Sequence, residues 1–542
     1  MLGLMMKREL LISDLIEHAN KVHKDREIFT LNADLSEHRY TWSDCATRVR
    51  KLANALLDAG IKEGDRVATI AWNNYRHIEI YYAVSSIGAV VHTINPRLKP
   101  EQIAWMVNHA EDTILMFDTT FGPIVDGVSA MCPTVKKWIC MCDSDSLPDY
   151  KTDVTDYESF IKGHSEQIEW PVFDENTAST LCYTSGTTGD PKGVLYSHRS
   201  TILHAMAGSF KDVIGAGGND VILAVVPMFH VSAWGLVYSA AMVGAKLVMP
   251  GPGLDGPNLT RIINQEKVTL MAGVPTVWLG IYNHVKSTGE SLPTVNKALV
   301  GGSALPESLL RAYEQELNIP MQQGWGMTET SPLGSTYCPH FTTDLDDYDS
   351  TVAHKLLAGR RIFGVEMRIV SDEGEILPED GETSGHLQVR GPWVASGYFK
   401  GAGSDNFTDD GWFATGDVSA LHPQGYMEIT DRSKDVIKSG GEWVSSIEVE
   451  NAACDHPEVS MAACIGVRHE KWQERPMLIV QAVPGTTPDK DEIKKCIEAK
   501  CAKWWLPDAI VFVDALPLGA TGKILKRELK VQYKDFDLEA NK

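Results

Sequence analysis

The sequence has few of the features that mark membrane, metal-binding or nucleic-acid-binding proteins. Its longest apolar runs, such as residues 221–227, are too short to cross a bilayer as a helix. None of its ten cysteines forms a Cys-x-x-Cys pair, so we expect no zinc site and reduced thiols in a cytoplasmic protein. The formal net charge of −22 argues against a general binder of nucleic acids or anionic membranes. These absences favour a globular protein without membrane insertion.

The chain of 542 residues is too long for one ordinary core, and its pattern changes along its length. In the first part, strand-like runs at residues 66–72 and 89–94 alternate with helical patterns at 41–60 and 76–88. This alternation predicts an α/β fold with mostly parallel, doubly wound sheets covered on both faces. Further on, short strands between turns predict a small β-rich section, and residues 338–355 read as a solvated loop. The last segment predicts a small α+β domain.

The most informative stretch is Thr184–Gly193, which follows a strand-like run. It combines glycines and hydroxyl side chains, in the order Thr184, Ser185, Gly186, Thr187, Thr188 and Gly189, and then Lys192. Glycines let backbone N–H groups turn toward one point, and the hydroxyls and the lysine add donors and charge, which suits a polyphosphate. It is not a Walker A loop, because Lys192 precedes Gly193. The alternative is a surface turn, but the density of donors favours phosphate binding.

A second polar run, Gln322–Thr330, offers groups for a nucleotide and a metal ion. Trp325 is a planar aromatic that can stack on a base, and Thr328 adds a hydroxyl. Glu329 is a hard carboxylate of the kind that Mg²⁺ prefers. Upstream, the strand-like run 297–303 ends in a glycine pair, which permits either close approach of a ligand or a tight turn.

Two further segments offer single candidate residues. His230 and Trp234 are four residues apart and share one face if the segment is a helix, although His230 is equally consistent with a structural histidine. Asp417 ends the loop-like run 411–417. A carboxylate there can accept hydrogen bonds from both ribose hydroxyls, and an ordinary turn aspartate is the alternative.

Taken together, these motifs resemble those of the adenylate-forming enzymes, which include acyl-CoA synthetases, peptide-synthetase adenylation domains and luciferases. Residues 184–193 resemble the phosphate loop of that family, and Gly324–Glu329 resembles its Gly-Tyr-Gly-Met-Thr-Glu motif with Trp325 in place of tyrosine. Six motif regions occur in family order, ending with Thr521–Lys523. The resemblance implies an ATP-dependent carboxylate–CoA ligase, which converts an acid to acyl-AMP and then to acyl-CoA with ATP, Mg²⁺ and coenzyme A.

The resemblance also assigns roles in the nucleotide and acyl sites. The loop and Lys192 would hold the phosphates, and Mg²⁺ would lie between the phosphates, Glu329 and Thr184. Asp417 and Arg432 would hold the ribose. The adenine side is assigned to Gly302, Ser303, Gln323, Gly324, Trp325 and Thr328, and the acyl pocket to His230, Trp234 and Gly301.

By the same resemblance, residues 1–430 form a large adenylating domain and residues 431–542 a small mobile domain, with a hinge at 431–435. Lys523 would bridge the carboxylate and the α-phosphate during adenylation. Rotation about the hinge would then replace Lys523 by residues that serve thioester formation, which are Asp435, Lys438, Gly440, Gly441, Glu442, Trp443 and Glu474. Gln473 stands where the family has a glycine in the loop before Glu474.

The substrate is expected to be a small acid. Trp234 and His230 would shorten the acyl tunnel, and the whole chain most resembles ligases for 3-(methylthio)propionate in marine bacteria, which also accept short-chain acids. A medium-chain fatty acyl-CoA ligase is the near alternative, and a nucleotide-binding protein that is no ligase is the alternative from another class. Relatives are often dimers, so a homodimer is expected.

Overall fold

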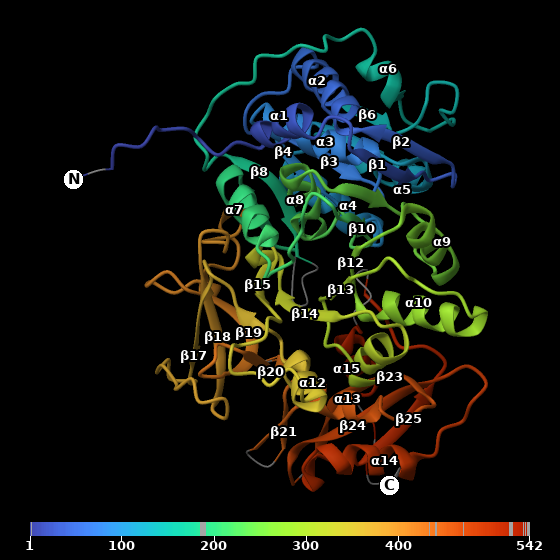
Figure 1. Ribbon diagram of the computed structural model, residues 1–542, viewed down its shortest axis with the longest axis vertical. Coiled ribbons are helices and arrows are strands. Elements are labelled where there is room, and N and C mark those ends of the chain that lie inside the picture. Colours follow the sequence, from blue (N-terminus) through green and yellow to red (C-terminus); the bar gives the residue numbers. More distant parts are fainter. Residues whose placement is uncertain are drawn as a thin grey trace.

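The computed structural model describes the whole chain except residues 2, 185–190, 433, 440–441, 470, 520–523, 535, 537 and 539–542, and except the side chains of Ser232, Glu442 and Trp443. The described residues form four sheets with helices between and around them (Figure 1). The segment before the first helix extends away from the body of the molecule (Figure 1). No helix in the described part of the chain has both the length and the apolar character that crossing a bilayer requires.

The first large sheet has seven strands in the order β7-β6-β5-β3-β4-β8-β9. All neighbours are parallel except β8 and β9, which are antiparallel. The strands are β3 (Arg66–Ile70), β4 (Val90–Thr93), β5 (Ile114–Phe117), β6 (Lys137–Cys140), β7 (Val154–Asp156), β8 (Ala178–Tyr183) and β9 (Gly193–Ser197).

The second large sheet has nine strands in the order β16-β15-β14-β13-β12-β10-β11-β1-β2. Its centre is parallel, and antiparallel strands close both edges. The strands are β1 (Glu27–Leu31), β2 (Glu37–Thr41), β10 (Val221–Ala224), β11 (Lys246–Met249), β12 (Leu270–Gly273), β13 (Lys297–Val300), β14 (Met321–Gly326), β15 (Leu333–Thr336) and β16 (Arg360–Arg361).

Helices cover both faces of both large sheets, which gives five layers. Between the sheets, one apolar core joins residues of both to α1 (Ile12–Val22), α2 (Trp42–Asp58), α3 (Tyr75–Ser86), α7 (His198–Ser209) and α8 (Leu236–Val243). The outer face of the seven-stranded sheet packs on α4 (Pro100–Ala110) and α5 (Gly122–Val128). The outer face of the nine-stranded sheet packs on α9 (Gly256–Glu266), α10 (Pro275–Thr288) and α11 (Glu307–Arg311). Strands buried on both faces read as continuous apolar runs, as the sequence does.

A third sheet is antiparallel and has four strands, β17 (Glu366–Val370), β18 (Ser384–Arg390), β19 (Phe413–Leu421) and β20 (Met427–Arg432). It is the β-rich section that the sequence predicts. β20 ends at Arg432, so the first two residues of the expected hinge at 431–435 belong to this strand.

The last segment forms a fourth sheet with helices beside it (Figure 1). Its strands are β21 (Ile437–Ser439), β22 (Glu442–Val444), β23 (Val459–His469), β24 (Gln473–Ala482) and β25 (Ala509–Val513). Two separate apolar cores lie on its two faces. The helices are α13 (Ser446–Ala453), α14 (Lys490–Lys500) and α15 (Lys526–Gln532). Elsewhere in the chain, the remaining α-helices are α6 (Tyr157–Ile161) and α12 (Tyr348–Leu356).

Local signals fix several helix starts. Thr41 accepts a hydrogen bond from the backbone N–H of Asp44, and the Asp44 carboxylate accepts one from the backbone N–H of Thr41, so α2 begins with a capping box. Ser445 caps α13 by accepting from the N–H of Glu448. In the sequence, each cap residue stands three positions before an acidic residue, which is the spacing of a capping box.

Two sequence interpretations of local structure were wrong. Residues 338–355 are not entirely a loop, because α12 begins at Tyr348, and Asp347 caps it by accepting from the N–H groups of Asp349 and Ser350. The run 411–417 is not a loop up to its end, since β19 already begins at Phe413.

Candidate active site

The base of the expected phosphate loop is held by two reciprocal contacts. The N–H of Thr184 donates to the carbonyl of Lys192 at 2.9 Å, and the N–H of Lys192 donates to the Thr184 hydroxyl at 3.3 Å. These contacts continue the antiparallel pairing of β8 and β9. The structure thus brings Thr184 and Lys192 together. The other loop residues named above, Ser185, Gly186, Thr187, Thr188 and Gly189, lie outside the described residues.

Glu329 lies in the short 3-10 helix η5 (Thr328–Thr330) and is nearly buried, with 5% exposure. Tyr398 donates a hydrogen bond of 2.6 Å to its carboxylate, and the Lys192 ammonium lies 4.9 Å from the centre of the Tyr398 ring. Burial raises the pKa of Glu329, while the Tyr398 hydrogen bond and the charges of Arg432 and Lys192 oppose that rise. A lysine, a tyrosine and a carboxylate therefore converge at this point.

The arrangement around Glu329 fits a magnesium ion that comes with a nucleotide. In the described part of the chain, no group of three or more histidine, cysteine, aspartate or glutamate side chains could hold a metal ion alone. Mg²⁺ is typically bound through one or two carboxylates and the phosphates of its substrate. Glu329 supplies such a carboxylate, and the hydroxyl of Tyr398 holds it in place.

Trp325 and Asp417 meet across two sheets. The indole N–H of Trp325, in β14, donates to the Asp417 carboxylate of β19 at 2.9 Å. The other carboxylate oxygen of Asp417 lies 3.2 Å from Nε of Arg432, its neighbour in β20. Asp417 is 3% exposed and its hydrogen bond with Trp325 is buried, whereas the Arg432 side chain is half exposed. The sequence predicted these three residues separately, and the structure joins them in one chain of contacts.

The glycine after β13 lets two residues of the expected acyl pocket, Gly301 and Trp234, approach each other closely. A Cβ atom on Gly301 would lie 2.8 Å from the Trp234 ring, so only glycine allows this close approach. Gly302 has a φ of +85°, and Ser303 is exposed beside it. At Gly324, a Cβ atom would lie 3.0 Å from the carbonyl oxygen of Ser335, which is a tight contact.

Gln323 has a structural role in this arrangement. Its side-chain oxygen accepts from the N–H of Leu305 at 3.0 Å, and its amide donates to the carbonyl of Leu356 at 3.4 Å. The side chain is buried and fastens the loop after Gly301–Ser303 to β14. Thr328 is likewise anchored, because its carbonyl accepts a 2.7 Å hydrogen bond from Tyr196.

His230 and Trp234 do not share a regular α-helical face. His230 directly precedes the short 3-10 segment η3 (Val231–Gly235), and Trp234 lies within it. Val231, Ala233 and Trp234 have positive φ angles. α8 begins only at Leu236. The helical spacing of the sequence was therefore misleading here, and a tight left-handed turn, not a helix, places Trp234 on Gly301. Left-handed conformations are costly for such residues.

Of the residues expected to serve thioester formation, Lys438 lies in β21, Glu442 and Trp443 in β22 and Glu474 in β24, while Asp435 precedes β21. The N–H of Lys438 donates to the Glu474 carboxylate at 3.0 Å, which brings these two together. Asp435 pairs with Lys530 at 3.2 Å. Gly440, Gly441 and Lys523 lie outside the described residues. Gln473, which replaces the family's glycine, has a φ of +69°, a conformation that favours glycine.

Sequence reasoning missed Tyr398 and Tyr196, which hold Glu329 and Thr328. Both hydroxyls reach their partners over long separations, 69 residues for Tyr398 and 132 for Tyr196. Neither tyrosine lies in a motif. Only the pairing of distant strands and loops shows their role, so no local signal could have found them.

The comparison with family models defines the class of protein. Residues 16–399 match the AMP-binding enzyme family, and residues 448–523 match the AMP-binding enzyme C-terminal domain. The chain belongs to the AMP-binding enzyme family.

Full-length relatives narrow the class to CoA ligases. The chain is 48% identical over 542 residues to 3-methylmercaptopropionyl-CoA ligase of Ruegeria lacuscaerulensis, covering 99% of each chain. It is 46% identical to medium-chain-fatty-acid–CoA ligase of Ectopseudomonas oleovorans, covering 100% of this chain and 99% of the other. Its fold is similar to that of an anthranilate CoA ligase in complex with anthranoyl-AMP, with a TM-score of 0.87 at 24% identity over 98% of each chain. The protein is an AMP-forming acyl-CoA synthetase that uses ATP, Mg²⁺ and coenzyme A.

Proposed function

We propose that the enzyme activates 3-(methylthio)propionate and other short-chain acids. The observation that carries this proposal is the contact between Trp234 and Gly301, which sets a bulky indole against the end of β13. A wall at that point limits the depth available to an acyl chain. The 48% identity to a 3-methylmercaptopropionyl-CoA ligase supports the same substrate class.

The chemistry begins with two anions that must meet. A carboxylate is a poor electrophile. Attack of its oxygen on the α-phosphate of ATP expels pyrophosphate and gives acyl-AMP, a mixed anhydride from which AMP leaves in the second step. In our proposal, Lys192 and the loop after Thr184 bind the outer phosphates, and Glu329 holds the Mg²⁺ that neutralises them. Lys523 draws the carboxylate and the α-phosphate together. Catalysis of this kind works mainly by positioning and electrostatic stabilisation.

The nucleoside part of ATP is proposed to lie between two sheets. Asp417 and Arg432 would contact the ribose, and Trp325, Gly302 and Ser303 would border the adenine. Asp417 retains accepting capacity for this task, because each carboxylate oxygen can accept two hydrogen bonds, and the contacts shown are one hydrogen bond from Trp325 and one ion pair with Arg432.

Thioester formation is proposed to follow a rotation of residues 431–542 against residues 1–430 about the hinge at 431–435. It would remove Lys523 and bring Lys438, Gly440, Gly441, Glu442 and Trp443 to the acyl-adenylate, with Asp435 and Glu474 behind them. The contact of Glu474 with the Lys438 N–H supports their assignment to one group.

A medium-chain fatty acid is the second candidate substrate, because the relative that carries that name is nearly as similar, at 46% identity. The test is CoA thioester formation with 3-(methylthio)propionate and with straight-chain acids from propionate to decanoate. The proposal expects the highest kcat/KM for the short acids. A maximum at octanoate or decanoate would favour the second candidate and contradict ours.

We also propose that the enzyme is a homodimer in the cytoplasm. All ten cysteines are free thiols, which fits a reducing compartment.

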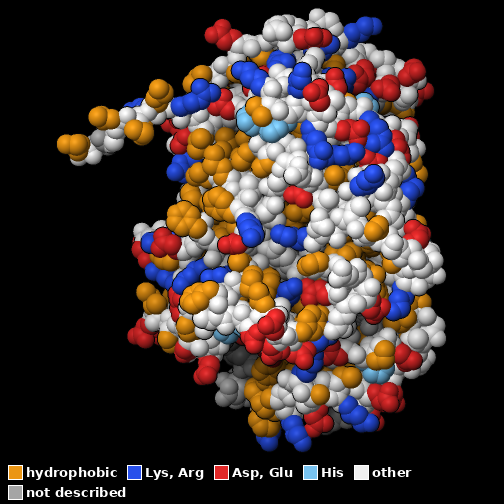
Figure 2. All heavy atoms as spheres, in the orientation of Figure 1, with side chains coloured by type: hydrophobic (Ala, Val, Ile, Leu, Met, Phe, Trp, Pro, Cys, Tyr) orange, Lys and Arg blue, Asp and Glu red, His pale blue; other side chains and the backbone are white. Residues whose placement is uncertain are grey.

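Acidic and basic side chains are interspersed over the face seen in Figure 2, so the negative net charge is not gathered in one patch there. Light scattering on the purified protein measures its mass directly, and a value of one chain would contradict the dimer.

A further inference from the structure

The turn that carries Trp234 has a strained backbone. Val231, Ala233 and Trp234 have φ angles of +44°, +49° and +56°, which place three residues with side chains in the left-handed region. This conformation is costly for residues other than glycine, and it persists only where the surrounding structure fixes the backbone. Contacts on both sides of the turn must therefore hold it.

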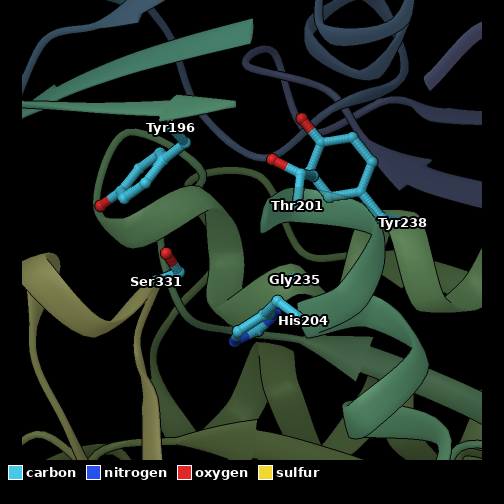
Figure 3. A pocket seen from close by; sticks show the side chains of 6 residues that line it. All are labelled: Tyr196, Thr201, His204, Gly235, Tyr238 and Ser331. Carbon is cyan, nitrogen blue, oxygen red and sulfur yellow. The ribbon is translucent and has the colours of Figure 1, made fainter. Parts of the chain in front are cut away.

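Close packing holds the end of the turn. Gly235, with a φ of +73°, lies beside the ring of His204 from α7, as Figure 3 shows. A Cβ atom on Gly235 would lie 2.6 Å from Nδ1 of that ring, so a side chain there would clash with it. The ring of Trp234 packs on Gly301 in a similar way. These contacts fix the point at which the turn enters α8.

One asparagine holds the segment before the turn. Asn73 is 4% exposed, and its side chain makes three hydrogen bonds with residues 224–228. Its amide donates to the carbonyls of Ala224 at 2.9 Å and Val226 at 2.7 Å, and its oxygen accepts from the N–H of Met228 at 2.7 Å. A single side chain therefore sets the path of the backbone between β10 and the turn.

The segment that Asn73 holds leads directly into the turn. Tyr81 of α3 donates a hydrogen bond to the carbonyl of Met228, so this residue is held through both its N–H and its carbonyl. The N–H of His230 then donates to the carbonyl of Pro227 at 3.1 Å. Hydrogen bonds thus fix the backbone up to the residue that precedes the turn.

Asn73 is itself placed by rigid neighbours. Asp118, directly after β5, accepts a hydrogen bond of 2.7 Å from the N–H of Trp72 and one of 2.9 Å from the amide of Asn74. The ends of β3 and β5 in the first sheet therefore support the segment that follows β10 in the second. All three are carboxyl ends of parallel strands, where ligands bind in open α/β sheets.

We infer that Asn73 is a positioning residue for the acyl site, which holds the strained turn in the conformation that keeps the Trp234 ring against Gly301. Without its hydrogen bonds, the turn can relax to a less costly backbone conformation. The indole would then no longer limit the depth of the acyl pocket, and longer acids would gain relative to shorter ones. This inference rests on the proposed function, in which Trp234 limits the acyl chain.

The test compares octanoate with butanoate in Asn73→Leu, which keeps a side chain of similar size and removes its hydrogen bonds. We expect the ratio of kcat/KM for octanoate to kcat/KM for butanoate to rise about two- to tenfold over the wild-type ratio, the range of one neutral hydrogen bond. KM for ATP should stay unchanged, because residues 224–228 are not among those assigned to the nucleotide. Ratios within one enzyme cancel any loss of folded protein.

Tyr81→Phe keeps the test decisive if Asn73→Leu fails to fold. It removes only the hydroxyl that holds the Met228 carbonyl, and it should raise the same ratio. Tyr313→Phe is its matched control, because Tyr313 is also buried and donates to a backbone carbonyl, that of Trp278 at 2.7 Å, on the outer side of the second sheet.

Asn54→Leu is the matched control for Asn73→Leu. The amide of Asn54 also donates to two backbone carbonyls, those of Ser165 at 2.8 Å and Gln167 at 3.1 Å, which belong to neither the turn nor the segment before it. Neither control variant should change the ratio of octanoate to butanoate.

Unchanged ratios in both Asn73→Leu and Tyr81→Phe would overturn the inference, as would an equal change in the two controls. A rise in KM for ATP as large as the change in the acid ratio would also overturn it, because that result indicates a general structural role. A wild-type maximum at octanoate would instead overturn the proposed substrate class. The wild-type profile tests the proposed function, and the comparison of variant with wild type tests the role of Asn73.

Discussion

The indole of Trp325 donates to the carboxylate that we assign to the ribose, in addition to offering its ring to the adenine. The sequence predicted the ring from its place in the Gly-Trp-Gly motif. It could not predict the hydrogen bond, because Trp325 and Asp417 are 92 residues apart and lie on different sheets. The same limit applies to Tyr398 and Glu329. Residue types in motifs were predictable, and their contacts across sheets were not.

Replacing Trp325 by phenylalanine keeps an aromatic ring and removes this hydrogen bond. Asp417 then loses one of its two partners, so we expect KM for ATP to rise about two- to tenfold with a smaller change in kcat. Trp393→Phe is the matched control, because Trp393 donates to the carbonyl of Leu333 and not to Asp417. Steady-state kinetics at saturating acid and CoA measures both. Equal KM values for the two variants would contradict the role of the indole N–H.

At the scale of elements, the alternation of strand-like and helical patterns was sufficient to predict the layered architecture of the first part of the chain. α2 was predicted at 41–60 and is observed at Trp42–Asp58, because its capping box is a local signal. α12 was missed because an acidic run suggested a solvated loop, although one of its aspartates, Asp347, is the helix cap. The Val231–Gly235 turn was misread because a spacing of four residues also fits a helix. Nothing in the sequence indicated that three residues of this turn have positive φ angles.

The hairpin of β21 and β22 gives a prediction about the second half-reaction. The two strands are antiparallel, and Gly440 and Gly441 connect them in the sequence. Gly440→Pro removes an N–H and fixes φ at this connection. We expect AMP transfer, measured as pyrophosphate release, to be retained and thioester formation to be lost. Equal loss of both reactions in a variant that still unfolds cooperatively would reject this division of labour.

A carboxylate pair between α13 and β20 gives a prediction about stability and pH. Burial, together with the charges of Glu428 and Asp431, raises the pKa of Glu448 to about 7. An acid whose folded-state pKa is raised destabilises the fold once it ionises, so stability falls as pH rises from about 4.5 to about 7.

Glu448→Gln should therefore raise Tm at about pH 8 and change it little at about pH 4.5. The substitution keeps the cap of α13, because the backbone N–H of residue 448 still donates to the Ser445 hydroxyl. Glu498→Gln, on the exposed side of α14, is the control and should show no such pH dependence. Thermal unfolding by circular dichroism measures the shift. A Tm gain that is the same at both pH values would argue against ionisation of Glu448 as the cause.

At the scale of the whole molecule, the last sheet contacts the rest through few polar links. Lys500 of α14 pairs with Glu307 of α11 at 2.6 Å, and within its own segment it also pairs with Asp455 at 2.9 Å. The N–H of Ser446 donates to Asp431 at 2.7 Å. The layered α/β architecture was predictable from the sequence, but these links were not, because they join residues that are far apart in the chain.

Lys500→Ala removes the ion pair with Glu307 and should let the last segment vary more in its orientation relative to the rest of the chain. The ion pair is partly exposed and contributes about 0–1 kcal/mol, which still changes a two-state population up to about fivefold. Fluorescence energy transfer between a label on α10 and one on α14 should therefore show a broader distance distribution. Lys503→Ala is the matched control, because Lys503 pairs with Glu498 in the same part of the chain. An unchanged distribution in Lys500→Ala would exclude a role for this link in domain orientation.

The most direct test of the account separates the two half-reactions in Lys523→Ala. In the wild-type enzyme with ATP, Mg²⁺ and 3-(methylthio)propionate but no CoA, we expect acyl-AMP and pyrophosphate in amounts equal to the enzyme. In Lys523→Ala, the rate of this step should fall by at least about 100-fold, the effect of removing one preorganised electrostatic group. Thioester formation from synthetic acyl-AMP and CoA should be retained. Acyl-AMP formation at the wild-type rate in Lys523→Ala, or its absence from the wild-type enzyme, would contradict the account.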